Sequence, residues 1–374
     1  MYCNNEVMVC LSGEVHGDDT SVIREKLKEK KPKYFILWQV GESGAPQFKT
    51  HLNHDFIDGK KHSDIIEFEK ILLENNTKFY FVVGSDNNDF DFLNFERYPV
   101  SNFHILYWPT FLLHYTYYLL ITKYNSLPEI DFKNGIENLF INYNNKSKIH
   151  RAKLIDELCK KDLLKNGTIS WHGTYREMMD YDFECWEEKI IKIDNYTIPL
   201  INSSHVDSIL DFKSLINLVS ETSYFHKSFF ITEKTFKPIF LNQIFISLGA
   251  CNQNTNLKKY GFQLYDELFD YSFEKDENLE KRIEGIVENI LKFENMNYNQ
   301  IYDSVFNKIN YNRNKAIDIV KDDPFIPNEI LELYNIYGDE FLRLFDNWNR
   351  TYSDTYPFTR GIKLFDEIFK TKKI

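Results

Sequence analysis

Short apolar runs alternate with amphipathic stretches along most of the chain. In the first third, the apolar runs predict strands and the stretches between them predict helices that bury one face. Alternation of this kind is typical of a parallel sheet whose strands are joined by helices. The strands are expected at residues 6–11, 34–40 and 78–83, and the helices at 21–29 and 65–73.

The pattern weakens between residues 126 and 138, where Pro128 and Gly135 interrupt it, and then restarts. We therefore expect an α/β fold of two Rossmann-like domains. The predicted domains are residues 1–130 and 131–330, and the helical tail 331–374 is expected to cross back onto the first. In the second domain we expect strands at 138–143, 167–171, 229–231 and 244–248, and helices at 152–164, 208–219, 233–239 and 278–293.

Residues 103–122 are rich in apolar and aromatic side chains and are predicted to form a buried helix. His104, His114 and several aromatic rings interrupt this stretch, so a membrane span is not expected. The N-terminus has neither a basic start nor a long apolar run, so no signal peptide is expected. Five scattered cysteines, with no Cys-x-x-Cys pair, favour a reducing compartment. A cytoplasmic protein is the simplest interpretation.

The net charge of −11 argues against a protein that holds nucleic acid mainly by neutralising phosphates. Two basic runs, at 26–33 and 146–165, are interpreted mainly as solvated helix faces. The preference for Asn, Lys, Ile, Tyr and Phe fits an AT-rich genome, such as that of a virus or a low-GC bacterium. Asp89-Phe90-Asp91 resembles a metal-binding triplet, but such triplets are common by chance, and we expect no metal and no cofactor.

Polar loops follow the first three predicted strands, at the edge of the sheet where parallel α/β proteins bind ligands. These loops hold the acids that could act as a general base toward an acceptor hydroxyl. The sequence does not choose among the candidates. They are Glu14, Asp18 and Glu42.

In the second domain, a basic loop follows the strand 138–143 and opens a helix at Arg151. Backbone N–H groups and the helix dipole favour an anion at such a place, and an arginine adds a fork of donors. Further along, Glu221 precedes the segment 229–236, in which Thr232 is expected to cap a helix starting at Glu233. This combination suits a phosphorylated ligand.

The segment Phe230-Ile231-Thr232-Glu233-Lys234, with Ser220-Glu221-Thr222-Ser223 before it, resembles the nucleotide-sugar motif of the alpha-fucosyltransferase family. The resemblance covers residues 218–271. It implies a GT-B glycosyltransferase, with two Rossmann-like domains facing a cleft. Three positions depart from the family pattern, so fucose is not carried over as the sugar. Ser220 stands for Phe, Thr222 for Asn and Phe230 for Tyr.

The resemblance also implies roles for individual residues. Glu233 would bind ribose or sugar hydroxyls, Lys234 and Arg151 would bind the diphosphate, and Glu221 would contact the donor sugar or order its loop. Together with Thr232, these residues form the predicted donor site.

The expected reaction is metal-independent transfer of a sugar, with inversion, from a nucleoside-diphosphate donor to a hydroxyl. The expected acceptor is a glycan or a modified nucleobase. Three alternatives remain open at this point. They are a viral enzyme that glycosylates DNA bases, a non-catalytic nucleotide-sugar-binding module, and another GT-B-like enzyme.

Overall fold

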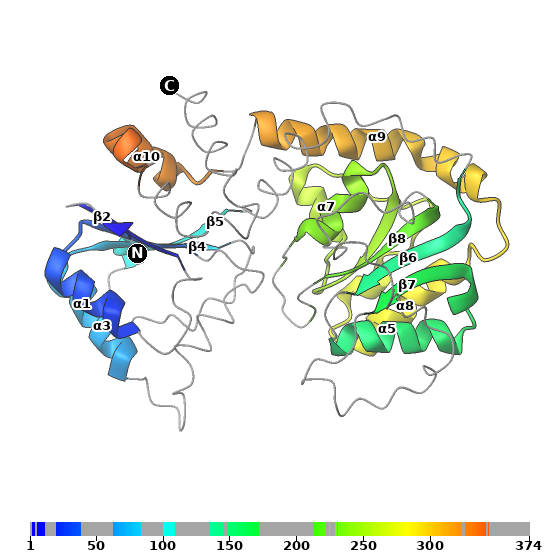
Figure 1. Ribbon diagram of the computed structural model, residues 1–374, viewed down its shortest axis with the longest axis horizontal. Helices are drawn as coiled ribbons and strands as arrows, with labels where there is room; N and C mark the ends of the chain where they lie inside the picture. Colours follow the sequence, from blue (N-terminus) through cyan, green and yellow to red (C-terminus); the bar gives the residue numbers. More distant parts are fainter. Residues whose placement is uncertain are drawn as a thin grey trace. The chain divides into compact units, whose positions relative to one another are not determined.

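The structure is a computed structural model (Figure 1). The chain divides into two compact units, residues 1–118 with 321–374 and residues 119–320. Each unit is described separately below. The described residues are 2–3, 6–11, 20–38, 63–83, 100–108, 135–144, 148–171, 213–221, 224, 229, 231–322, 326–341 and 343.

The first unit contains a sheet with the strand order β1-β2-β3-β4-β5. Strands β2 to β5 are parallel, and β1 pairs with β2 in the antiparallel direction. The bounds are β1 Tyr2–Cys3, β2 Val7–Leu11, β3 Tyr34–Trp38, β4 Lys78–Val83 and β5 Phe103–Tyr107, with helices α1 Thr20–Lys30, α3 Ser63–Asn75 and α10 Asn328–Tyr337.

Helices α1 and α3 cover one face of this sheet (Figure 1). Their apolar side chains, including Leu27 and Leu72, join one core with alternate strand residues such as Phe35 and Phe79. Helix α10 belongs to the same unit, because the Tyr337 ring packs edge-on against Tyr34 and its hydroxyl donates to the Glu6 carboxylate.

The second unit contains a parallel sheet with the order β7-β6-β8-β9. In Figure 1, α5 and α8 lie on one face of this sheet, and α7 and α9 lie on the other. The bounds are β6 Asn138–Asn144, α5 Ile149–Lys160, β7 Gly167–Trp171, β8 Ser214–Ser220, α7 Glu233–Phe240, β9 Ile244–Leu248, α8 Leu279–Leu291 and α9 Tyr298–Asp322.

The predicted α/β class with parallel sheets is confirmed, but three sequence-based elements differ in the structure. Residues 103–107 form strand β5, not the start of a helix. The stretch expected as a helix at 208–219 contains strand β8, in which every residue is buried. Burial on both faces removes the alternation that marks a half-exposed strand, and the polar residues Ser214, Asn217 and Ser220 recur at every third position, a spacing that resembles a helix. The segment expected as a strand at 229–231 contributes an isolated bridge at Phe229.

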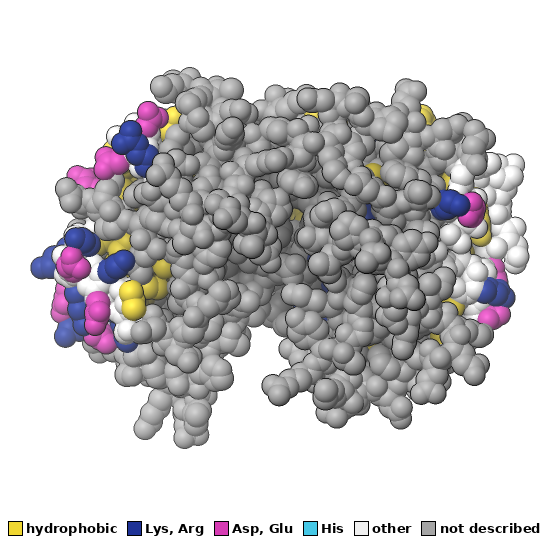
Figure 2. All heavy atoms as spheres, in the orientation of Figure 1, with side chains coloured by type: hydrophobic (Ala, Val, Ile, Leu, Met, Phe, Trp, Pro, Cys, Tyr) yellow, Lys and Arg dark blue, Asp and Glu magenta, His cyan; other side chains and the backbone are white. Residues whose placement is uncertain are grey.

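Two lysines of the basic run at 26–33 form ion pairs with acids in the structure. Lys28 and Arg24 both contact Glu67 of α3, and Lys30 contacts Glu29. Figure 2 shows basic and acidic side chains interspersed over this part of the surface. Among the described residues, this helix therefore presents a mixed-sign surface, as a solvated helix face does. No helix within the described part of the chain is long and apolar enough to span a membrane.

Candidate functional site

The strand order of the second sheet identifies a topological switch point at the carboxyl ends of its two central strands. The chain passes from β6 to β7 on one side and then returns to place β8 on the other side of β6. Connections leave in opposite directions at this point, which lies between the carboxyl ends of β6 and β8. Parallel α/β sheets bind their ligands at such switch points.

Helix α5 begins beside this switch point, and its first turn carries no acidic residue and no capping side-chain hydrogen bond. Arg151 Nη2 donates to Ser220 O at 3.2 Å, and His150 Nε2 lies 2.8 Å from Glu221 O. Both side chains are buried, with 3% of Arg151 exposed. The start of α5 is thus attached to the end of β8, and its positive dipole end and a guanidinium lie at the switch point.

Helix α7 begins on the other side of the β8 terminus, and residues at its start donate hydrogen bonds to the Glu221 carboxylate. Glu221 Oε1 accepts from the Thr232 backbone N–H at 3.2 Å and from Thr235 Oγ1 at 2.5 Å, while Oε2 accepts from Thr232 Oγ1 at 2.6 Å. Thr232 also accepts from the Lys234 N–H at 3.2 Å, which confirms it as the N-cap. The Glu221 side chain is fully buried. These bonds hold the first turn of α7 against the end of β8.

Polar side chains gather at the carboxyl ends of these strands. Asn142 Nδ2 donates to Leu218 O at 2.6 Å and to Ser220 Oγ at 3.1 Å. The neighbouring Asn144 donates through Nδ2 to Asn142 Oδ1 at 2.5 Å, and its backbone N–H donates to Ser170 Oγ at 3.2 Å. A polar cluster therefore joins the carboxyl ends of β6, β7 and β8.

On the opposite face of β6, Lys237 of α7 places its ammonium group 4.2 Å from the centroid of the Tyr143 ring. Only 2% of Lys237 is exposed. Successive strand residues point to opposite faces, so Asn142 and Asn144 face α5 and α8 while Tyr143 faces α7. A buried cation on the α7 side and Arg151 on the α5 side thus flank the end of β6.

The predicted donor residues fall into two groups in the structure. Arg151, Glu221, Thr232 and Lys234 all lie around the end of β8, linked through the contacts given above. The backbone of Glu233 begins α7, and its side chain lies outside what the structure describes. The candidate bases Glu14, Asp18 and Glu42 also lie outside the described residues, as does the Asp89–Asp91 triplet.

Sequence reasoning missed four side chains of this region. Asn142 and Asn144 interrupt an apolar strand, and this interruption was a usable signal, because central parallel strands are normally apolar throughout. His150 and Lys237 gave no such signal, since a histidine or lysine in an amphipathic helix is ordinary. Their burial depends on contacts with residues far away in the sequence.

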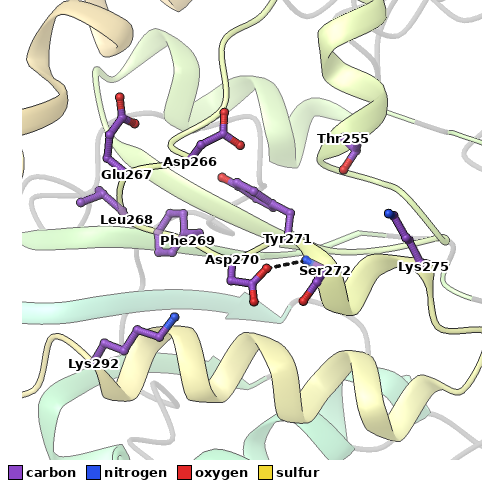
Figure 3. A pocket seen from close by; sticks show the side chains of 10 residues that line it. All are labelled: Thr255, Asp266, Glu267, Leu268, Phe269, Asp270, Tyr271, Ser272, Lys275 and Lys292. Atoms are coloured by element: carbon purple, nitrogen blue, oxygen red, sulfur yellow. Dashed lines mark hydrogen bonds between the residues drawn. The ribbon is translucent and has the colours of Figure 1, made fainter.

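A separate hollow of about 650 Å³ lies elsewhere in this unit (Figure 3). It is formed mainly by the segment that follows Tyr265, whose ring packs edge-on against Phe245 of the edge strand β9. The lining residues are Thr255, Asp266, Glu267, Leu268, Phe269, Asp270, Tyr271, Ser272, Lys275 and Lys292.

Several charges of this hollow already have partners. Asp270 Oδ1 accepts from the Ser272 N–H at 2.8 Å, Glu267 pairs with Lys308 at 2.6 Å, and Lys292 donates to Asn289 at 2.9 Å. None of the predicted donor residues lines it. We therefore favour the switch point, where strand topology, a helix terminus and buried cations coincide.

No group of His, Cys, Asp and Glu in the described part of the chain has a metal-binding arrangement. Comparisons with protein-family models, with curated proteins and with solved structures find no match to this chain. The case for a function therefore depends on the residues and their arrangement.

Proposed function

We propose that the protein is a glycosyltransferase that takes a sugar from a nucleoside-diphosphate donor. The donor binds beyond the carboxyl ends of β6 and β8, and the enzyme has the two-domain GT-B organisation. The observation that carries the proposal is the convergence of Arg151, the uncapped start of α5 and the Lys234-bearing start of α7 at a topological switch point.

The chemistry requires a stabilised leaving group. When the acceptor hydroxyl attacks the anomeric carbon, the bond from that carbon to the diphosphate breaks and negative charge grows on the diphosphate. Arg151 and Lys234, with the helix N-termini, supply fixed positive potential for that charge. One of Glu14, Asp18 or Glu42 would take the acceptor proton. The resemblance of residues 230–234 to the alpha-fucosyltransferase motif supports the same donor class.

Glu221 takes the loop-ordering role in this proposal. Its two oxygens are engaged by Thr232 and Thr235, so it holds α7 in place for the residues that touch the donor. Thr232, as the N-cap, fixes where the helix starts and therefore where Lys234 lies.

Ligand binding tests the proposal. The full-length protein is screened by thermal shift with GDP-, UDP-, ADP- and CMP-sugars, and hits are measured by calorimetry. Loss of one charge-assisted phosphate contact costs about 1.5–3 kcal/mol, so Arg151→Ala and Lys234→Ala should each weaken binding by roughly 10- to 100-fold. Lys292→Ala, at the separate hollow, is the matched control and should bind as the wild type does.

Turnover is then followed as release of the nucleoside diphosphate, with Glu233→Ala beside the two cation variants. Binding or donor hydrolysis that survives both Glu233→Ala and Lys234→Ala would show that the site assignment is wrong. Binding without turnover on any acceptor would instead favour the non-catalytic module.

A further inference from the structure

Two buried hydrogen-bond acceptors belong to the last residue of β6 and to the first turn of α5. They are Oδ1 of Asn144 and Nδ1 of His150, and both side chains are fully buried. Neither atom has a hydrogen-bond partner among the described residues. A buried acceptor without a donor costs about 1–3 kcal/mol, so each of these two atoms requires an explanation.

The orientation of the Asn144 amide follows from a backbone carbonyl. Leu218 O accepts only, so the atom of Asn142 that faces it at 2.6 Å is Nδ2. Asn142 therefore presents Oδ1 to Asn144, so the Asn144 atom that donates to it is Nδ2. This leaves Asn144 Oδ1 as an acceptor. Exchanging O and N in either amide would bring two donors or two acceptors together.

The tautomer of His150 follows in the same way. Glu221 O accepts only, so Nε2 carries the proton and donates at 2.8 Å. Burial lowers the pKa of His150 well below its usual value, and the positive charges of Arg151 and Lys148 from α5 and Arg282 from α8 add to that effect. The ring is therefore neutral, and Nδ1 keeps a lone pair.

The His150 ring is also held in place. It stacks on Tyr224 with ring centroids 4.3 Å apart, and Tyr224 O accepts from Arg282 Nη2 at 2.6 Å. Arg282 itself is buried and donates to two further carbonyls, those of Asp276 and Glu277. The acceptor atom is thus fixed by contacts from α5, α8 and the segment that follows β8.

We propose that Asn144 Oδ1 and His150 Nδ1 accept hydrogen bonds from hydroxyl groups of the donor bound at the switch point. This inference rests on the proposed function and extends it. Phosphate oxygens need donors, which Arg151 and the start of α5 provide, whereas these two atoms can only accept. They fit the hydroxyl-bearing part of a nucleotide sugar, either its ribose or its transferred sugar.

The experiment compares ligands that differ by a single hydroxyl. The nucleotide found to bind is titrated against its 2′-deoxy and 3′-deoxy forms, and its sugar conjugate against analogues that lack one sugar hydroxyl. In the wild type, removing a contacted hydroxyl should weaken binding by about twofold to tenfold. A loss with the deoxynucleotides would show that the ribose supplies the hydroxyl, and a loss with the sugar analogues would show that the transferred sugar supplies it.

The same comparison in variants assigns the contact. In Asn144→Ala or His150→Phe, the affinity ratio of the hydroxylated and deoxy ligands should fall to about one for the hydroxyl that each residue binds. Phe keeps a ring to stack on Tyr224. Lys292→Ala, at the separate hollow, is the control, because its side chain contacts Asn289 and neither acceptor residue; its ratio should match the wild type.

The wild-type comparison tests the proposed hydroxyl contacts even if a variant does not fold. If the nucleotide binds but no single hydroxyl matters in either arm, the inference is overturned and the proposed function stands. Hydroxyl dependence that persists unchanged in folded Asn144→Ala and His150→Phe would also overturn it. If no nucleotide or nucleotide sugar binds, the proposed function fails and this inference fails with it.

Discussion

Replacing Glu221 by Ala should loosen helix α7 while the rest of the second unit remains folded. The side chain is fully buried and accepts three hydrogen bonds, two from Thr232 and one from Thr235. The substitution leaves three donors without their acceptor. At about 1 kcal/mol for each, the local stability of α7 should fall by about 3 kcal/mol, before any cost of the cavity is added.

Hydrogen exchange measured by mass spectrometry reports that local stability directly. A loss of about 3 kcal/mol corresponds to exchange on the order of 100-fold faster in peptides that cover residues 233–240. Peptides from α8 should change much less. Glu221→Gln, which keeps one oxygen, should show a smaller effect.

Glu288→Ala is the matched control for Glu221→Ala. Glu288 pairs with Lys161 on the surface, where 54% of the Glu288 side chain is exposed, and exposed pairs contribute little to stability. Its variant should exchange like the wild type. If Glu221→Ala also exchanges like the wild type in α7, Glu221 does not hold this helix, and its loop-ordering role must be abandoned.

Three further outcomes follow from the structure. Gly285→Ala should destabilise the protein by about 1–3 kcal/mol in urea unfolding, although Ala favours helices, because the added Cβ would lie 2.3 Å from Phe273 Cβ; a stabilised variant would contradict the packing. Thr232→Ala should destabilise α7 by about 1–2 kcal/mol and Thr232→Ser by less, because Ser keeps the capping oxygen; equal exchange rates in the two variants would argue against the cap. Burial lowers the pKa of His150, so the unfolded chain binds a proton below pH of about 6.5 while the folded chain does not. Stability should therefore fall as the pH drops from about 6.5 toward the folded-state pKa, by up to about 1.4 kcal/mol per pH unit, and His150→Phe should lack this component in unfolding curves measured across that range.

The α/β class and much of the local structure could be predicted from the sequence, because alternating short apolar runs and amphipathic stretches leave few other folds. The strand at Lys78–Val83 and the cap at Thr232 are local features, and local patterns predicted both. Strand β8 could not be distinguished from a helix, because burial on both faces removes its periodicity.

The site was predictable only in part, for a physical reason. A motif around Thr232 and a basic helix start at Arg151 are visible in the sequence. Their convergence at the end of β8 depends on strand order, and strand order is set by long-range pairing. The acceptor atoms of Asn144 and His150 depend on single carbonyls of Leu218 and Glu221, more than 70 residues away in the sequence.

The most direct test of the central claim is to map where a nucleoside-diphosphate sugar protects the wild-type chain from hydrogen exchange. If the donor binds at the switch point, protection should appear in peptides that cover residues 148–152, 218–221 and 231–236. The hollow lined by residues 266–272 should remain unchanged. Protection confined to that hollow, or protection of neither region by any of the nucleotide sugars, would contradict the assignment.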